Sequence, residues 1–108
     1  MQHFFVYGTL APGCPNEHIL APIKGLWREG TVKGTLYHEG WGAEQGYPGI
    51  VLDDKGEEVP GMLFSSEALT EQWEMLDVFE GEGYQRTLVV VTLNDGSQIE
   101  AQIYSLRI

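Results

Sequence analysis

The chain has 108 residues, 43% of them hydrophobic, and a formal net charge of −10. This length predicts a single domain over residues 1–108, which is too small for a cofactor domain plus a substrate domain. The negative charge disfavours nucleic acid and anionic membranes as partners, because both would be repelled by such a surface.

Short strands separated by turns are predicted for the first half of the chain. The first covers residues 3–7, which are aromatic or β-branched apart from His3, and it ends where Gly8 lets the chain turn. The other segments predicted here are a loop over 11–22 with room for one helical turn, one or two strands over 25–38, a loop over 40–49, and strands over 49–53 and 59–64.

The second half is predicted to hold the main helix and the clearest hairpin. The helix covers residues 66–79 and is stopped by Gly81. Strands over 84–93 and 98–106 flank Asn94-Asp95-Gly96, which is a turn signal. The predicted fold class is therefore α+β: a small, mostly antiparallel β-barrel of about six strands with one main helix packed against it.

Glu80 is the residue that breaks the helical pattern. At 100° per residue, and with Leu69 at zero, the apolar arc runs from roughly 240° to about 40°, and Glu80 falls at about 20°. The arc includes Trp73 and Leu76, whereas Asp77 falls on the polar side. A carboxyl inside the arc should have a raised pKa, which would let it take and return a proton near neutral pH.

Two structural alternatives for Glu80 stay open from the pattern alone. The helix could unwind at Phe79, so that the carboxyl swings out to solvent, or Glu80 could form a buried ion pair with Arg86. Elsewhere, the three histidines and the single Cys14 show no metal-ligand spacing, so no metal and no cofactor is expected.

A single cysteine fits a reducing compartment, and the N-terminus has no signal-peptide pattern. No apolar run approaches the roughly 20 residues of a membrane span. A cytoplasmic protein is therefore expected. The expected oligomeric state is a monomer or a weak homodimer. An exposed patch for contact between copies could come from Trp27, Trp41 and Phe64.

Five sequence blocks together resemble the gamma-glutamylcyclotransferase-like family, in particular its AIG2-like and gamma-glutamylamine cyclotransferase members. They appear in family order and span nearly the whole chain: FVYGTL at 5–10, PNEHIL at 15–20, YPGI at 47–50, VPGMLF at 59–64 and LDVFEGEGYQR at 76–86.

The resemblance implies an enzyme that needs no cofactor and acts on a small γ-glutamyl substrate. The substrate's own α-amine attacks its γ-carbonyl, which closes a five-membered ring and releases 5-oxoproline and a free amine. Carried over by position, Glu80 is similar to the family's general acid/base. Tyr7, Gly8, Thr9 and Leu10 match its substrate-binding loop, and Tyr47 and Tyr84 match aromatic positions near the pocket.

Two segments depart from the family pattern. PNEHIL has one more residue between Asn16 and His18 than the usual loop, and residues 40–46 match no family signature. The alternative function is a non-catalytic module that binds a small molecule in the same pocket.

Overall fold

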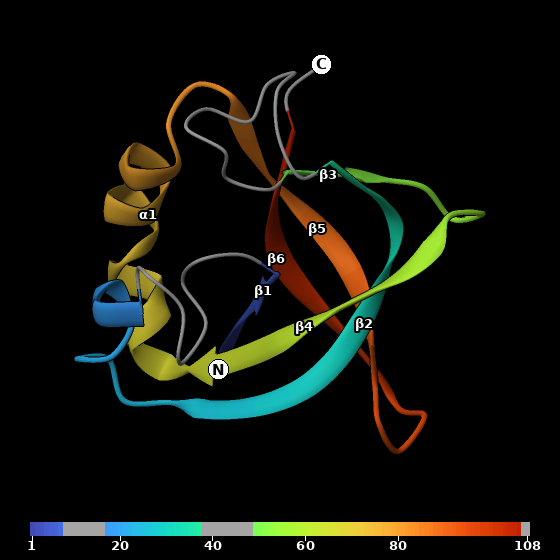
Figure 1. Cartoon of the computed structure of the whole chain (residues 1–108). Coiled ribbons are helices and arrows are strands. Elements are labelled where there is room, and N and C mark those ends of the chain that lie inside the picture. Colours follow the sequence, from blue (N-terminus) through green and yellow to red (C-terminus); the bar gives the residue numbers. More distant parts are fainter. Residues whose placement is uncertain (8–16, 38–48, 107–108) are drawn as a thin grey trace.

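The computed structural model describes residues 1–7, 17–37 and 49–106 and has an α+β architecture (Figure 1). Its helical segments are the 3-10 helices η1 (Glu17–Ile19) and η3 (Glu67–Glu71) and the α-helix α1 (Trp73–Glu80). Its strands are β1 (Gln2–Val6), β2 (Leu26–Tyr37), β3 (Gly49–Leu52), β4 (Glu57–Ser66), β5 (Tyr84–Leu93) and β6 (Gln98–Leu106).

The sheet closes into a five-stranded barrel, which confirms the predicted fold class. Hydrogen-bonded neighbours follow the order β3-β2-β4-β1-β6-β5, and a further pairing of β2 with β5 closes the ring. β3 is the extra strand, attached to β2 outside the ring. Among the described strands only β1 and β6 pair in parallel, so the sheet is mostly antiparallel as predicted.

Two paired glycines let the barrel bend where three strands meet. Gly30 of β2 pairs with Gly61 of β4. A Cβ on Gly30 would lie 2.8 Å from Cγ1 of Val91, and a Cβ on Gly61 would lie 2.5 Å from the carbonyl oxygen of Val6. Because only glycine allows such close approach, the sequence of β2 favours one long curved strand rather than two.

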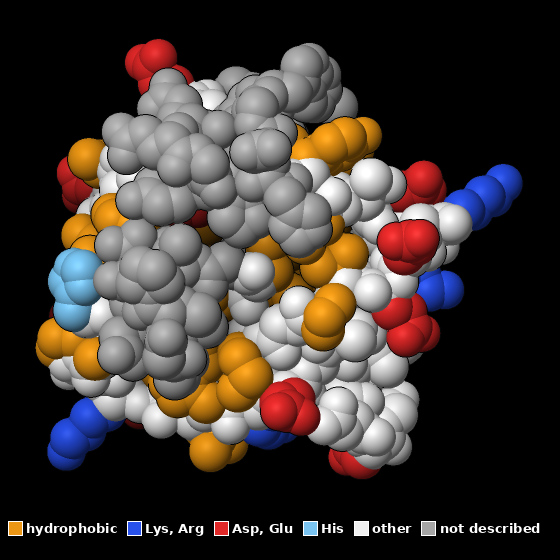
Figure 2. Space-filling view, viewed as in Figure 1, with side chains coloured by type: hydrophobic (Ala, Val, Ile, Leu, Met, Phe, Trp, Pro, Cys, Tyr) orange, Lys and Arg blue, Asp and Glu red, His pale blue; other side chains and the backbone are white. Residues whose placement is uncertain are grey.

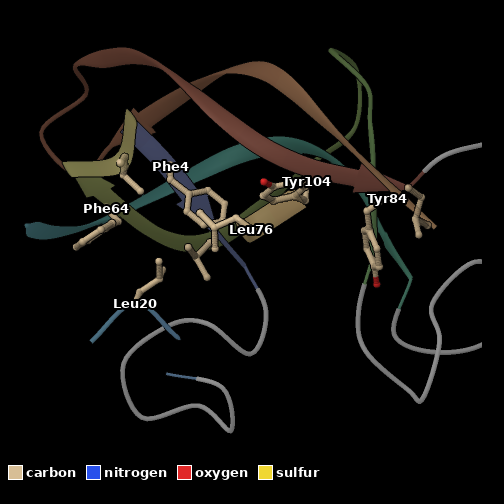
Figure 3. Close-up of a cluster of buried hydrophobic side chains, with 9 residues drawn as sticks. Phe4, Leu20, Phe64, Leu76, Tyr84 and Tyr104 are labelled. Carbon is tan, nitrogen blue, oxygen red and sulfur yellow. The ribbon is translucent and has the colours of Figure 1, made fainter. Parts of the chain in front are cut away.

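Both faces of β1 are buried, each in a different core. Phe5 points into the barrel, whereas Phe4 and Val6 point outward under the helical segment. Figure 3 shows this second cluster, with Tyr84 at the opposite end from Phe64. Helix α1 therefore covers the outer face of the barrel at β1 and at the end of β6.

The helix predicted over residues 66–79 is correct in place but wrong in detail. Ser66 caps a 3-10 helix by accepting a hydrogen bond from the amide of Ala68, and the α-helix begins only after Gln72. A 3-10 helix turns by about 120° per residue instead of about 100°, so the projection misplaces residues 67–71 but keeps the relative positions within α1. The projection places Met75 and Phe79 at about 240° to 280°, inside the apolar arc, but these side chains are 39% and 36% exposed.

The proposed exposed patch of Trp27, Trp41 and Phe64 is not present as expected. Phe64 is fully buried and packs against Trp27 with ring centroids 4.6 Å apart. Trp41 lies outside the described residues. In the part of the chain that is described, no helix is long and apolar enough to cross a membrane.

Candidate functional site

The candidate site lies where the end of β1 approaches the end of α1. Tyr7 directly follows β1, and Glu80 is the last residue of α1. Gly81 then ends the helix with φ 83° and ψ −173°, a backbone conformation that favours glycine. The amide of Gly81 still donates to the carbonyl of Asp77, at 3.1 Å, so the last turn is closed and Glu80 is held in it.

Burial gives the Glu80 carboxyl a raised pKa, as the helical projection predicts. Desolvation raises it from 4.5 to about 7. The helix runs through Glu80, so the alternative in which it unwinds at Phe79 is wrong. A pKa near 7 means that the protonated and ionised forms are both well populated at neutral pH.

The second alternative, a buried pair between Glu80 and Arg86, is also wrong. The Arg86 guanidinium lies 3.7 Å from Oδ2 of Asp77 and stacks over the Trp73 ring, 4.9 Å from its centroid. Arg86 is thereby engaged one helical turn before Glu80. No cation among the described residues is paired with the Glu80 carboxyl to lower its pKa.

Tyr7 links the end of β1 to two other strands. Its hydroxyl donates a 2.6 Å hydrogen bond to the carbonyl oxygen of Tyr104 and accepts one of 3.2 Å from the amide of Ile50. Burial raises the pKa of Tyr7, and the neighbouring Tyr84 and Glu80 raise it further. The Tyr7 ring is therefore anchored close to both of these predicted site residues.

Tyr104 and Asp77 complete the polar network on the helix side. The Tyr104 hydroxyl donates to Oδ1 of Asp77 at 2.6 Å. Burial raises the pKa of Tyr104, and the hydrogen bond to Asp77 raises it further, with a smaller contribution from Glu80. One residue, Tyr104, thus holds Tyr7 through its main chain and α1 through its side chain.

The sequence reading placed neither Tyr104 nor Asp77 in the site. The projection places Asp77 on the polar side, and Tyr104 falls within a predicted strand. A signal was present in β6, where the outward positions Gln98, Glu100 and Gln102 are polar but the next one is Tyr104. An aromatic residue that ends a polar series indicates that another element covers that position.

Tyr84 lies beside Tyr7 and Glu80 but is part of the apolar cluster under α1. It is 8% exposed, and its amide donates to the carbonyl of Gly81 at 3.4 Å, which closes the short connection from α1 to β5. The structure therefore brings together Tyr7, Glu80 and Tyr84. The remaining predicted site residues, Gly8, Thr9, Leu10 and Tyr47, lie outside the described residues, as do Cys14 and Asn16.

The arrangement of Glu80 and Tyr7 suits proton transfer. Within residues 1–7, 17–37 and 49–106, no group of three or more histidine, cysteine, aspartate or glutamate side chains could hold a metal ion. The Tyr7 hydroxyl is occupied by two hydrogen bonds, which suits an anchor better than a proton donor. Glu80 is thus the group at this site that is tuned to exchange a proton near neutral pH.

Comparisons with known proteins agree with this architecture. The profile of the family described as gamma-glutamyl cyclotransferase, AIG2-like, matches residues 4–107. A search of the curated proteins finds no significant match.

Solved structures show the same fold. The crystal structure of a mouse AIG2-like protein has a TM-score of 0.76 and 29% identity, over 97% of this chain and 76% of that one. YkqA from Bacillus subtilis has a TM-score of 0.74 and 29% identity, over 99% of this chain but only 36% of its own length. A solved gamma-glutamyl cyclotransferase has a TM-score of 0.69 and 19% identity, over 98% of this chain and 66% of that one. This likeness shows the fold alone.

The five-stranded barrel with its covering helix is thus shared with a class of α+β proteins that includes the mouse AIG2-like protein. Because the family profile spans almost all of its length, the chain belongs to the AIG2-like gamma-glutamyl cyclotransferase family.

Proposed function

We propose that the chain is a gamma-glutamyl cyclotransferase that converts a γ-glutamyl amine or peptide into 5-oxoproline and a free amine. The observation that carries the proposal is the carboxyl of Glu80, which burial tunes to a pKa of about 7 beside Tyr7, at the start of the YGTL loop. Family membership supports the reaction class.

In the proposed reaction Glu80 transfers a proton twice. The ionised carboxyl takes a proton from the substrate's α-ammonium, and the freed amine attacks the γ-carbonyl carbon, forming the new C–N bond of the ring. The protonated carboxyl then gives this proton to the departing nitrogen as the original amide C–N bond breaks, and the ring nitrogen loses its remaining extra proton to the released amine or to water, which leaves the neutral lactam of 5-oxoproline. One group near pKa 7 suits both steps, because it is a competent base and a competent acid at neutral pH.

The remaining roles are assigned to binding. Amides of Gly8, Thr9 and Leu10 would hold the substrate carboxylate and stabilise the oxyanion, as the family resemblance implies. Tyr7 would fix the start of this loop through its bonds to Tyr104 and Ile50. Holding the amine next to its own carbonyl lowers the entropic barrier to ring closure.

The test is release of 5-oxoproline from a panel of γ-glutamyl amines and γ-glutamyl peptides, measured by chromatography. Glu80→Gln is expected to lower kcat by about 100-fold or more. Glu74→Gln is the matched control, because Glu74 lies on the same helix but is exposed. Full turnover by a folded Glu80→Gln protein would show that the assignment of Glu80 is wrong.

The products also separate the alternatives. A non-catalytic module would bind 5-oxoproline or glutamate in calorimetry without converting any member of the panel. A hydrolase on the same fold would release free glutamate instead of 5-oxoproline. Either result would replace the cyclotransferase proposal.

A further inference from the structure

A groove on the barrel face away from Glu80 is not used by the proposed reaction. It has a volume of about 830 Å³ and lies where β2 and β5 separate from each other. The two strands pair only at Gly30–Leu93 and Thr31–Thr92, so they diverge beyond that point. Binding clefts span roughly 300–1,000 Å³, which puts this groove within the usual range.

One wall of the groove is an incompletely paired strand with exposed apolar side chains. Within the described residues, β5 pairs with β6 along its length but with β2 only at its last two positions. Leu88 and Val90 line the groove and are 56% and 51% exposed. A strand edge that carries exposed apolar residues is a ready template for another strand.

Four carboxylates lie in the rest of the lining, among polar and apolar side chains. Asp53 and Asp54 lie in the β3–β4 turn, and Glu58 and Glu100 approach from β4 and β6. One cation, Lys33, faces these four carboxylates in the groove. Figure 2 shows several acidic side chains, with basic ones among them, on the side of the molecule that carries this turn, which is opposite α1 in Figure 1.

The carboxylates and exposed apolar side chains of the groove favour one kind of ligand over others. A second copy of this chain would bring another net charge of −10 to an acidic groove, and nucleic acid would be repelled in the same way. Lysine and arginine have long apolar stems below a charged head, so such side chains could cover Leu88 and Val90 while their heads reach the carboxylates. The extended backbone of a bound peptide could form hydrogen bonds with the edge of β5.

We propose that this groove binds an extended peptide segment of a partner protein, with lysine or arginine alternating with apolar residues, alongside β5. The proposal is independent of the cyclotransferase reaction, because Leu88 and Val90 lie on β5 away from the Tyr84 end that contacts the candidate site. It places an interaction surface on the opposite side of the barrel from α1.

The experiment uses fluorescence anisotropy with the full chain and labelled eight-residue peptides. A Lys-Val alternating peptide is expected to bind, more weakly as salt rises, whereas a Glu-Val alternating peptide is not. The double variant Asp54→Asn/Glu100→Gln removes one carboxylate from the β3–β4 turn and one from β6. It is expected to weaken binding roughly 5- to 30-fold. Leu88→Ser tests the apolar contact, and a thermal melt of each variant checks that it is folded.

The matched control is Glu71→Gln/Glu74→Gln, which makes the same change in net charge on exposed residues of the helical side. It is expected to leave the peptide affinity within about twofold of the parent. Equal weakening by the control, or equal binding of the Glu-Val peptide, would show that only net charge or nonspecific contact is at work. Amide chemical-shift changes that avoid residues 88–91 would also overturn the proposal.

Discussion

The hydroxyl of Tyr104 donates a 2.6 Å hydrogen bond to Oδ1 of Asp77, which lies one helical turn before Glu80. The carbonyl oxygen of the same Tyr104 accepts the hydroxyl of Tyr7. This residue therefore connects the helix that carries the proposed acid to the strand that leads into the proposed binding loop. It is a positioning residue, so its loss should lower kcat as well as stability.

Removing the Tyr104 hydroxyl should loosen this connection. Tyr104→Phe keeps the ring contacts with Phe4 but deletes the bond to Asp77, and we expect a loss of about 1–2 kcal/mol in the free energy of unfolding. We expect kcat for 5-oxoproline release to fall roughly tenfold while KM changes little, because the acid is misplaced. Urea denaturation and steady-state kinetics measure the two effects.

Asp77→Asn is the companion variant. It keeps an oxygen that can accept from Tyr104 and removes the charge opposite Arg86. Because that ion pair is partly exposed, we expect a stability loss of no more than about 1 kcal/mol and a smaller fall in kcat than in Tyr104→Phe. A larger kinetic effect in Asp77→Asn would mean that the charge, not the hydrogen bond, positions the helix.

Local sequence signals were sufficient for the strands but not for the site network. The hairpin was predicted at its observed bounds, because alternation and the Asn94-Asp95-Gly96 turn are both local signals. The parallel pairing of β1 with β6 and the closure of β2 on β5 join distant segments, so no local pattern specifies their partners. The Tyr104–Asp77 bond depends on both the closure and the helix position.

The position of Glu80 could be predicted because it needed only the helix period near the C-terminal end. The same projection failed for Met75 and Phe79, since one flank of α1 has no element of the described chain over it. Periodicity states which side chains share a face but not how wide the covering surface is.

The pH dependence of stability should carry a contribution from Glu80. The carboxyl has a pKa of 4.5 in the unfolded chain and about 7 in the folded protein, so the folded state binds the proton more tightly. The stability it contributes is fully present below pH 4.5 and is lost as the pH rises through about 7. The free energy of unfolding of Glu80→Gln, relative to that of the parent, should therefore rise by about 2–3 kcal/mol between pH 4.5 and pH 8.

Urea denaturation of the two proteins at several pH values measures this difference directly. Other carboxyls titrate equally in both proteins and cancel in the comparison. Stability curves that run parallel from pH 4.5 to pH 8 would show that the Glu80 pKa is not raised by folding.

The same pKa should appear in catalysis if Glu80 is the proton acceptor. The free enzyme must hold Glu80 ionised to accept the ammonium proton, so kcat/KM should rise with pH and level off above about 7. Initial rates of 5-oxoproline release across a pH series give the midpoint of this acid limb. A midpoint near 4.5 would indicate an ordinary exposed carboxyl instead.

Gly81 should be needed for its backbone conformation rather than for space. Its φ is 83°, and a Cβ placed on it would meet nothing within 4 Å, so Gly81→Ala introduces strain without a steric clash. We expect a stability loss of about 1–3 kcal/mol, and a fall in kcat because the strained turn shifts the end of α1. Gly96→Ala is the matched control: Gly96 has φ 87°, also with open space, in the β5–β6 turn. That variant should lose similar stability and keep its kcat, so equal kinetic losses in both would show that Gly81 does not position Glu80.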